Sequence, residues 1–334
     1  MPGFKKRWGQ LRLPNLFAIY FDVENSGERV KKNDLTNAER ELSERLPGPP
    51  AMAAIRATNV WIIEWLPPND LHTGQLLHDW MKYRRPGWSA YSPCNTKTGV
   101  IAAIERATSR SQESKMIPVL HLEAHGSEVG LEGPDGTGDL ELLTWDELTD
   151  PLQQLNLMTG CNLVVVVAAC TGFAGIKALS RGPRAPAVAL VGPDAPVMPG
   201  NLLWATKEFY RRWQDKNPTL DGIAASASQE AGTVTFELEP FVVLAYEAMI
   251  EQLIISMRPD EQHRRAERIR QRMFAANEWS MAEIERRLSR LPPLPSAVDL
   301  QRAWDEMFMI DLYPENRERF GIDMTAIVEM VIGR

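Results

Sequence analysis

The sequence predicts an α/β fold in which helices cover both faces of a mostly parallel β-sheet. Solid apolar runs recur along the N-terminal part of the chain, with residues 162–169 as the clearest example. Such runs are typical of strands that are buried on both faces. Stretches of helical character separate the runs, and this alternation favours parallel strands joined by right-handed crossovers. We therefore predict a three-layer sandwich followed by a helical C-terminal extension.

The predicted strands are apolar runs that stop at a turn-forming or charged residue. A run rich in aromatic residues ends at Asp22, and later runs end at Pro67, Gly126, Cys170 and Gly192. Glycine and proline are the residues that most often interrupt a strand. A further segment alternates apolar and polar residues, which is typical of an edge strand. We expect strands at residues 16–21, 59–66, 117–125, 162–169 and 187–191, and an edge strand at 233–238.

Helices are expected between the strands and throughout the C-terminal part. The prolines of segment 47–50 end the first helix, because proline cannot continue one. We predict helices near residues 35–46, 74–83, 99–109, 145–155 and 172–180, with a Gly- and Asp-rich loop at 127–138. After residue 240 the pattern is helical: 241–256, 259–276, 280–291 and shorter pieces after 299. The predicted division is an α/β domain at 10–238 and a helical region at 239–334.

Composition excludes several classes of protein. Hydrophobic residues make up 44% of the 334 residues and charged residues 24%, which are globular values and exclude a disordered or fibrous chain. The net charge of -7 argues against a dedicated nucleic-acid binder. The longest apolar run, at 163–170, is too short to span a membrane, and the N-terminus lacks the features of a signal peptide. We expect partners that are neither nucleic acids nor membranes.

The chain contains only three cysteines, Cys94, Cys161 and Cys170. A sparse, odd set does not form a disulfide framework, so we expect a reducing, cytoplasmic location. Cys94 and Cys161 lack the spacing to another cysteine that a metal site needs. Cys170 differs from both, since it stands at the end of a predicted strand.

His125 and Cys170 end two predicted strands, and each lies close before a glycine. Ligands of parallel sheets bind at the carboxyl ends of the strands. The 45 residues between His125 and Cys170 are enough for one helical crossover, so we expect the two strands to be neighbours. A nearby imidazole can take the proton of a cysteine thiol and leave a nucleophilic thiolate. Each residue taken alone is more often structural; the pair, its order and its strand context predict a catalytic dyad.

Two segments, LHLEAHG at 120–126 and VAACTG at 167–172, resemble the catalytic motifs of caspase-like cysteine peptidases, most closely those of the bacterial CHAT-type branch. Caspases carry Q-A-C-[RQG]-G with a histidine about 50 residues upstream. Here Ala168 stands in place of the glutamine and Thr171 occupies the variable position. The resemblance covers about residues 15–195 and makes 10–238 a peptidase domain. It does not extend to the helical C-terminal region.

The resemblance implies peptide-bond hydrolysis through a thioester acyl-enzyme, without a cofactor. Cys170 is the implied nucleophile and His125 the group that passes the proton to the leaving amine. The backbone N–H groups of Gly126 and Cys170 are the implied oxyanion hole. The implied partner is a specific protein substrate, encoded nearby in the genome, with a role in bacterial defence or regulated cell death.

Glu123 is a candidate for orienting the His125 imidazole. His121, Glu123 and His125 alternate along one predicted strand and share a face. Successive side chains on one face lie about 6.5 Å apart, so Glu123 is also a candidate for a purely structural contact with another side chain. His121 is interpreted as a hydrogen-bonded core histidine.

The resemblance also implies where specificity is set, at the end of the first strand and around the strand that follows the nucleophile. Asp22, Glu24 and Asp194 lie there, and acidic groups favour an arginine or lysine before the scissile bond. The alternative is that these carboxylates cap turns and helices.

Two other functions remain open on the sequence alone. One is a catalytically inactive caspase-fold module that binds a partner through its helical C-terminus. The other is a metal-assisted hydrolase that uses His121, Glu123 and His125, although their spacing is not that of the helical zinc motif H-E-x-x-H. The loop at 133–138 lacks the lysine of a phosphate-binding loop, and the basic run at 263–272 is interpreted as a solvated helix face.

Overall fold

The computed structural model describes residues 35–50, 55–179, 183–214, 236–275, 280–289 and 295–332. The predicted strand at 16–21, with Asp22 and Glu24 beyond it, lies outside the described residues. Contacts divide the chain into two compact units. One comprises residues 48–248 and 305–322, and the other comprises 1–47, 249–304 and 323–334.

Within the described residues, eight strands form one sheet. The main strand order is β2-β1-β3-β6-β7-β8, with the β4–β5 hairpin attached to β3. The pairs of β1 with β2 and β3, and of β6 with β3 and β7, are parallel. The last strand, β8, runs antiparallel to β7. The strand bounds are Asn59–Trp65 (β1), Ser89–Pro93 (β2), Pro118–Gly126 (β3), Gly130–Pro134 (β4), Leu140–Thr144 (β5), Val164–Ala168 (β6), Ala189–Pro193 (β7) and Phe236–Pro240 (β8).

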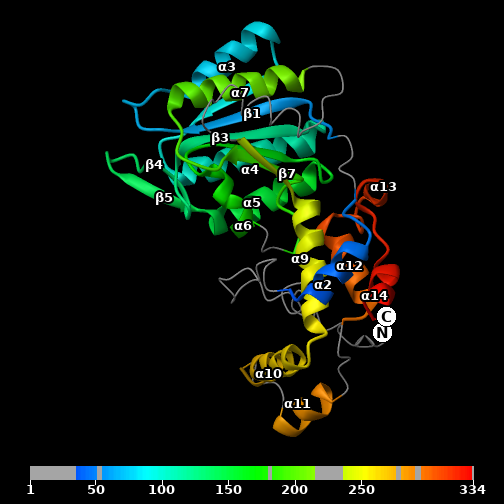
Figure 1. Ribbon diagram of the computed structural model, residues 1–334. Helices are drawn as coiled ribbons and strands as arrows, with labels where there is room; N and C mark the ends of the chain where they lie inside the picture. The colour runs from blue at the N-terminus through cyan, green and yellow to red at the C-terminus, as the bar shows by residue number, and fades with distance from the viewer. Residues whose placement is uncertain are drawn as a thin grey trace, which may run out of the picture. The chain divides into compact units, whose positions relative to one another are not determined.

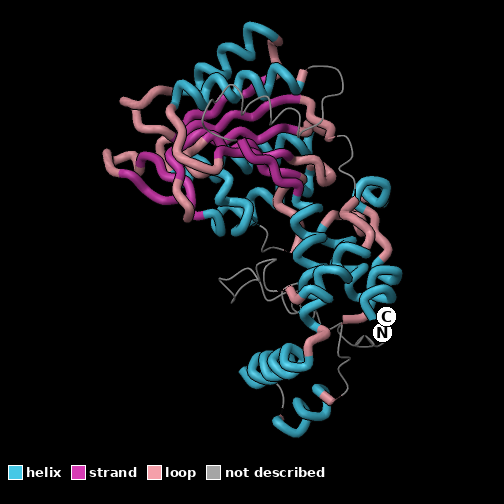
Figure 2. The backbone as a smooth tube through the Cα atoms, in the orientation of Figure 1, coloured by secondary structure: helices cyan, strands magenta, loops and turns pink. Residues whose placement is uncertain are grey.

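Helices cover both faces of this sheet, as Figures 1 and 2 show. On one face lie α3 (Thr73–Arg84) and α7 (Pro199–Trp213). On the other lie α4 (Lys97–Ser114), α5 (Trp145–Met158) and α6 (Gly175–Leu179), the last preceded by a 3₁₀ turn at Gly172–Ala174 (η2). The predicted α/β class and three-layer arrangement are confirmed.

The remaining described elements are helical and lie mostly in the C-terminal part. They are α2 (Asn37–Arg45), α9 (Phe241–Ser256), α10 (Pro259–Ala275), α11 (Met281–Leu288), α12 (Ala297–Met307), η3 (Pro314–Asn316), α13 (Arg317–Phe320) and α14 (Met324–Ile332). After β8 the described chain is thus helical, as the sequence predicts. The domain boundary at 238/239 stays a prediction.

Local sequence explains where the main helices begin. Thr144 accepts a hydrogen bond from the Glu147 backbone, and Glu147 reciprocates, which makes a capping box at the start of α5. Thr96 caps α4 through the Gly99 N–H. These caps satisfy backbone donors that a helix end leaves without partners.

An apolar core fills the space between the sheet and the layer formed by α3 and α7, and Cys170 packs against it. Even-numbered strand residues such as Ile62, Val166 and Ala168 pack there against Leu77 of α3 and Phe209 of α7, all of them buried. Cys170 is half-buried against the same cluster. The alternation of strand side chains therefore places Cys170 on the α3–α7 face.

Candidate active site

His125 and Cys170 lie at or just beyond the carboxyl ends of two neighbouring parallel strands. β3 and β6 are parallel neighbours, and their last pair joins Glu123 to Ala168. The offset of 45 residues in this pair is also the separation of His125 from Cys170. His125 is still within β3, whereas Cys170 lies in the turn two residues after β6 ends and packs against the core cluster on the α3–α7 face.

Gly126 and Cys170 approach each other closely at this edge. A Cβ atom placed on Gly126 would lie 2.2 Å from the Cys170 carbonyl oxygen and 2.8 Å from the Ala169 Cβ. No side chain fits in that space. The segment that follows His125 is therefore packed directly against the backbone of Cys170.

A tight turn holds Cys170 at the end of β6. Thr171 has a φ of 52°, in the left-handed region that β-branched residues rarely adopt. Its hydroxyl donates to the Cys170 carbonyl at 2.7 Å. A Cβ on Gly172 would lie 2.7 Å from the Val167 carbonyl, so the chain turns back tightly on β6. The thiol Sγ lies 3.8 Å from the Val197 carbonyl oxygen, which can accept its weak hydrogen bond.

His125 has a carboxylate partner, Asp70. The His125 Nε2 lies 2.7 Å from the Asp70 Oδ2, and the two side chains are 49% and 36% exposed. A carboxylate only accepts hydrogen bonds, so this contact places the ring proton on Nε2 and leaves the Nδ1 lone pair for proton transfer. Asp70 lies in the loop between β1 and α3, 55 residues before His125.

Glu123 has other partners than His125. Its Oε1 lies 2.9 Å from the His121 Nε2, and its Oε2 accepts from the Thr73 hydroxyl at 2.6 Å. In the structure Asp70, and not Glu123, is the carboxylate bonded to His125, so the expected Glu123–His125 contact is not formed. The physical reason is burial, because Glu123 is buried against the start of α3 whereas His125 is exposed near the end of β3. Asp70 could have been found with the same strand-end rule, since it follows a predicted strand.

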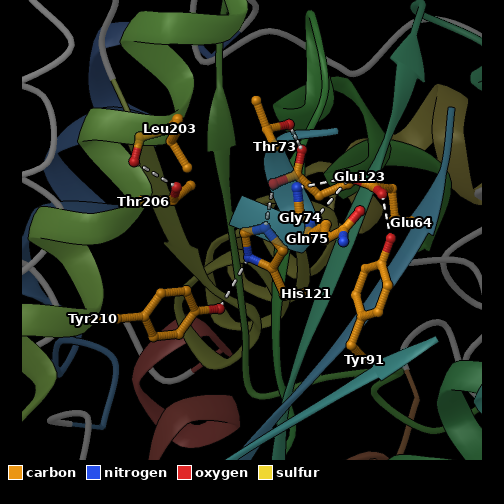
Figure 3. A network of polar contacts seen from close by, with 10 residues as sticks. All are labelled: Glu64, Thr73, Gly74, Gln75, Tyr91, His121, Glu123, Leu203, Thr206 and Tyr210. Carbon is orange, nitrogen blue, oxygen red and sulfur yellow. Dashed lines mark hydrogen bonds and ion pairs between the residues drawn. The ribbon is translucent and has the colours of Figure 1, made fainter. Parts of the chain in front are cut away.

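His121 belongs to the protein interior. It is fully buried, and its Nδ1 lies 3.0 Å from the Tyr210 hydroxyl (Figure 3). Burial and the charge of Glu123 raise the pKa of Tyr210 well above its usual value, so the phenol stays protonated. His121 therefore links Glu123 to α7.

The other two cysteines are poor nucleophiles. Burial raises the pKa of Cys94 to about 11 and that of Cys161 to about 12, despite positive charges near each. Both thiols therefore stay protonated at neutral pH. Cys170 is only half-buried.

One of the three predicted specificity residues can be located. Asp194 directly follows β7 and is exposed. In the same loop, the Ala195 carbonyl accepts from the Thr171 N–H at 3.4 Å, and the Val197 carbonyl lies near the Cys170 thiol. Asp194 is thus on the loop that borders Cys170, while Asp22 and Glu24 are outside the described residues.

The described residues contain no group of three or more His, Cys, Asp or Glu side chains arranged to hold a metal ion. An open hollow of about 310 Å³ lies among α4, α5 and β5, and none of the candidate site residues lines it. None of the helices in the described part of the chain is long and apolar enough to span a membrane.

The comparisons with known proteins identify no family for this chain. No protein-family model matches the chain. A search of curated proteins finds no match either. Among solved structures, the chain is similar to the complex of the pro- and mature domains of RgpB from Porphyromonas gingivalis, at 14% identity and a TM-score of 0.35. The similarity covers 56% of this chain and 48% of that chain, so it spans about half the length of each. At this TM-score, the similarity carries no argument about activity.

Proposed function

We propose that this chain is a cysteine endopeptidase with a caspase-like fold, and that it uses His125 and Cys170 as its catalytic dyad. The observation that supports the proposal is the close packing of Gly126, next to His125 on β3, against the backbone of Cys170 just beyond the neighbouring strand β6. This edge of the sheet is where parallel α/β folds bind ligands. The motifs at 120–126 and 167–172 favour the CHAT-type branch of that fold.

The proposed reaction begins with proton transfer from the Cys170 thiol to the His125 ring. The Cys170 sulfur then attacks the peptide carbonyl, and a tetrahedral oxyanion forms. This intermediate collapses to a thioester as the C–N bond breaks, and the histidine proton passes to the leaving amine. Water next attacks the thioester with His125 taking its proton, and the C–S bond breaks to release the acid product and the thiolate. The proton then returns from His125 to the Cys170 sulfur.

The rest of the site supports this reaction. Asp70 accepts the Nε2 proton of the His125 ring, so that Nδ1 is the nitrogen that exchanges protons. The backbone N–H groups of Gly126 and Cys170 are the proposed donors to the oxyanion. One such donor is worth about 3 kcal/mol of barrier. The reaction requires no metal or organic cofactor.

Asp194 is proposed to select the substrate. An exposed carboxylate on the loop beside Cys170 favours a basic residue before the scissile bond. Asp22 and Glu24 are part of the same proposal. Profiling with a peptide library tests it, because cleavage mainly after leucine or aspartate would contradict an acidic pocket.

The substrate is proposed to be one protein encoded near this chain and present with it in the cytoplasm, in a defence or cell-death response. The test is co-expression of the wild type or Cys170→Ala with the neighbouring gene products, followed by mass spectrometry of new protein termini. Termini that depend on Cys170 support the proposal. The matched control is Cys94→Ala, which removes a buried thiol and should leave the termini unchanged.

Identical termini with wild type and Cys170→Ala would contradict peptidase activity. The chain would then be assigned as an inactive module of the same fold. Loss of the termini on metal chelation, rather than on substitution of Cys170, would instead indicate a metal-assisted hydrolase.

A further inference from the structure

A buried carboxylate at the end of β1, Glu64, caps the start of α3 from outside the helix. Its Oε1 accepts from the Gly74 N–H at 2.7 Å and from the Gln75 N–H at 3.3 Å (Figure 3). The N-cap residue of α3, His72, makes no side-chain cap of its own. Glu64 therefore supplies the anion that a helix N-terminus favours.

The same carboxylate closes the loop that carries Asp70. The chain leaves β1 at Trp65 and returns at His72, whose Nδ1 lies 3.0 Å from the Glu64 Oε2. The Tyr91 hydroxyl from β2 donates to this oxygen as well. Glu64 is thus bonded to His72, which lies at the C-terminal end of the short loop that follows β1.

A second carboxylate holds the start of α3 from β3. Glu64 and Glu123 are register partners on β1 and β3. Glu123 accepts from the Thr73 hydroxyl. A Cβ on Gly74 would lie 3.0 Å from the Glu64 Oε1 and 3.1 Å from the Glu123 Cγ, so the end of the helix rests on both side chains. Asp70 is therefore followed directly by a segment that two neighbouring strands fix in place.

The burial of two carboxylates has a free-energy cost that their hydrogen bonds must offset. Both residues are only 2% exposed, and a buried charge is costly unless hydrogen bonds satisfy it. The Asp70–His125 contact is far more exposed, and exposed ion pairs alone hold geometry weakly. A carboxylate orients a catalytic imidazole only when its own backbone is held in place.

We propose that Glu64 is a positioning residue, which holds the loop at 66–72 so that Asp70 stays bonded to His125. The proposal rests on the proposed role of the His125–Cys170 dyad. Glu64 touches none of the proposed reacting atoms, and its effect on Cys170 passes through Asp70.

A double-mutant cycle tests this route. Glu64→Gln keeps the shape of the side chain but removes its charge and one acceptor. The rate of Cys170 alkylation by iodoacetamide should fall roughly tenfold, since small misplacements of a catalytic group are costly. In an Asp70→Asn background the same substitution should cause no further loss. Additive losses in the double variant would overturn the proposal.

The protonated nitrogen of His125 gives a second readout that needs no substrate. Ring ¹⁵N shifts, assigned by comparison with His125→Gln, report which nitrogen carries the proton. Glu64→Gln should reduce the Nε2–H population toward that of Asp70→Asn. An unchanged ring in Glu64→Gln would contradict the positioning role.

Two further variants separate positioning from stability. Thr206→Val removes a buried hydroxyl that bonds the Leu203 carbonyl at 3.1 Å within α7, away from the Asp70 loop. It should lower stability without changing the His125 ring. If Glu64→Gln does not fold, His72→Ala removes only the half-exposed partner of Glu64 and should shift the ring in the same direction.

The two proposals fail separately. Protein cleavage that is the same in wild type and Cys170→Ala would reject the peptidase while leaving the ring measurement intact. A Cys170-dependent cleavage together with additive losses in the cycle would reject only the role of Glu64.

Discussion

The His125 Nε2 lies 2.7 Å from the Asp70 Oδ2, and this contact joins the loop after β1 to the end of β3. Because β3 lies between β1 and β6 in the sheet, Asp70 follows one neighbour of the strand that carries His125 and Cys170 follows the other. Carboxylate, imidazole and thiol thus follow the order of the strands. This order is the one needed for a carboxylate to orient a base and for the base to activate a nucleophile.

Asp70→Asn should reduce kcat/KM by at least about tenfold, since the positioned base loses the group that fixes its tautomer. The asparagine amide can donate as well as accept, so it no longer selects the Nε2–H form. The measurement is the steady-state rate on a substrate found by terminus mapping. Asp135→Asn is the control, because this exposed aspartate bonds only its own loop, and it should leave the rate unchanged. Equal activity of Asp70→Asn and wild type would remove Asp70 from the site.

Alkylation should label Cys170 well before the other two cysteines. The raised pKa of Cys94, about 11, and of Cys161, about 12, keeps these thiols protonated until the pH exceeds those values. Both are buried as well. Brief treatment with iodoacetamide near neutral pH, followed by peptide mapping, checks the order. Labelling of Cys161 before Cys170 in folded protein would contradict it.

The ion pair between Glu39 and Arg258 should make stability depend on acid. Both guanidinium contacts are short, at 2.8 and 2.7 Å, and with the Thr36 N–H they lower the pKa of Glu39 from 4.5 to about 2. A lowered pKa stabilises the folded state above about pH 4.5, and this stabilisation is lost as the pH falls to about 2. Glu39→Gln should therefore destabilise by about 2 kcal/mol near neutral pH.

Urea denaturation near neutral pH and at about pH 2 measures the loss. The difference between Glu39→Gln and wild type should shrink as the pH falls through this window. Glu41→Gln is the control, since its side chain is 69% exposed and lies 4.0 Å from Arg45. A difference that grows in acid would reverse the assigned sign.

The sequence predicted β3 and β6 because parallel strands buried on both faces are continuous apolar runs. β2 (Ser89–Pro93) was missed because its residues are half-buried and it has no such run. β4 lies in the segment 127–138, which was predicted as a loop because glycine and aspartate are frequent there, and β5 was not predicted. Leu131 and Leu143 are nevertheless buried, and tertiary packing overrides the local preference.

The site residues also divide into those that regular strands carry and those that an irregular loop carries. The strands that precede His125 and Cys170 could be predicted as neighbours because crossover length acts through regular strands, and β3 and β6 are adjacent and parallel. The Asp70–His125 contact joins residues 55 apart through an irregular loop, and no periodicity reports such a contact. Glu64 could have been singled out from the sequence, because it is the only charged residue in the strand NVWIIEW. A lone charge in a buried strand calls for a partner.

Gly126→Ala should disrupt the junction between the end of β3 and the turn after β6. The added methyl group would lie 2.2 Å from the Cys170 carbonyl oxygen, which is backbone and cannot rotate away. We expect a loss of about 1–3 kcal/mol in the free energy of unfolding, as for other overpacked sites. Because Cys170 must shift to relieve the clash, its alkylation rate should also fall. Gly48→Ala is the matched control, since nothing lies within 4 Å of the added methyl group. If Gly126→Ala kept the wild-type alkylation rate and stability, His125 and Cys170 would not be adjacent in solution, and the proposed dyad would be wrong.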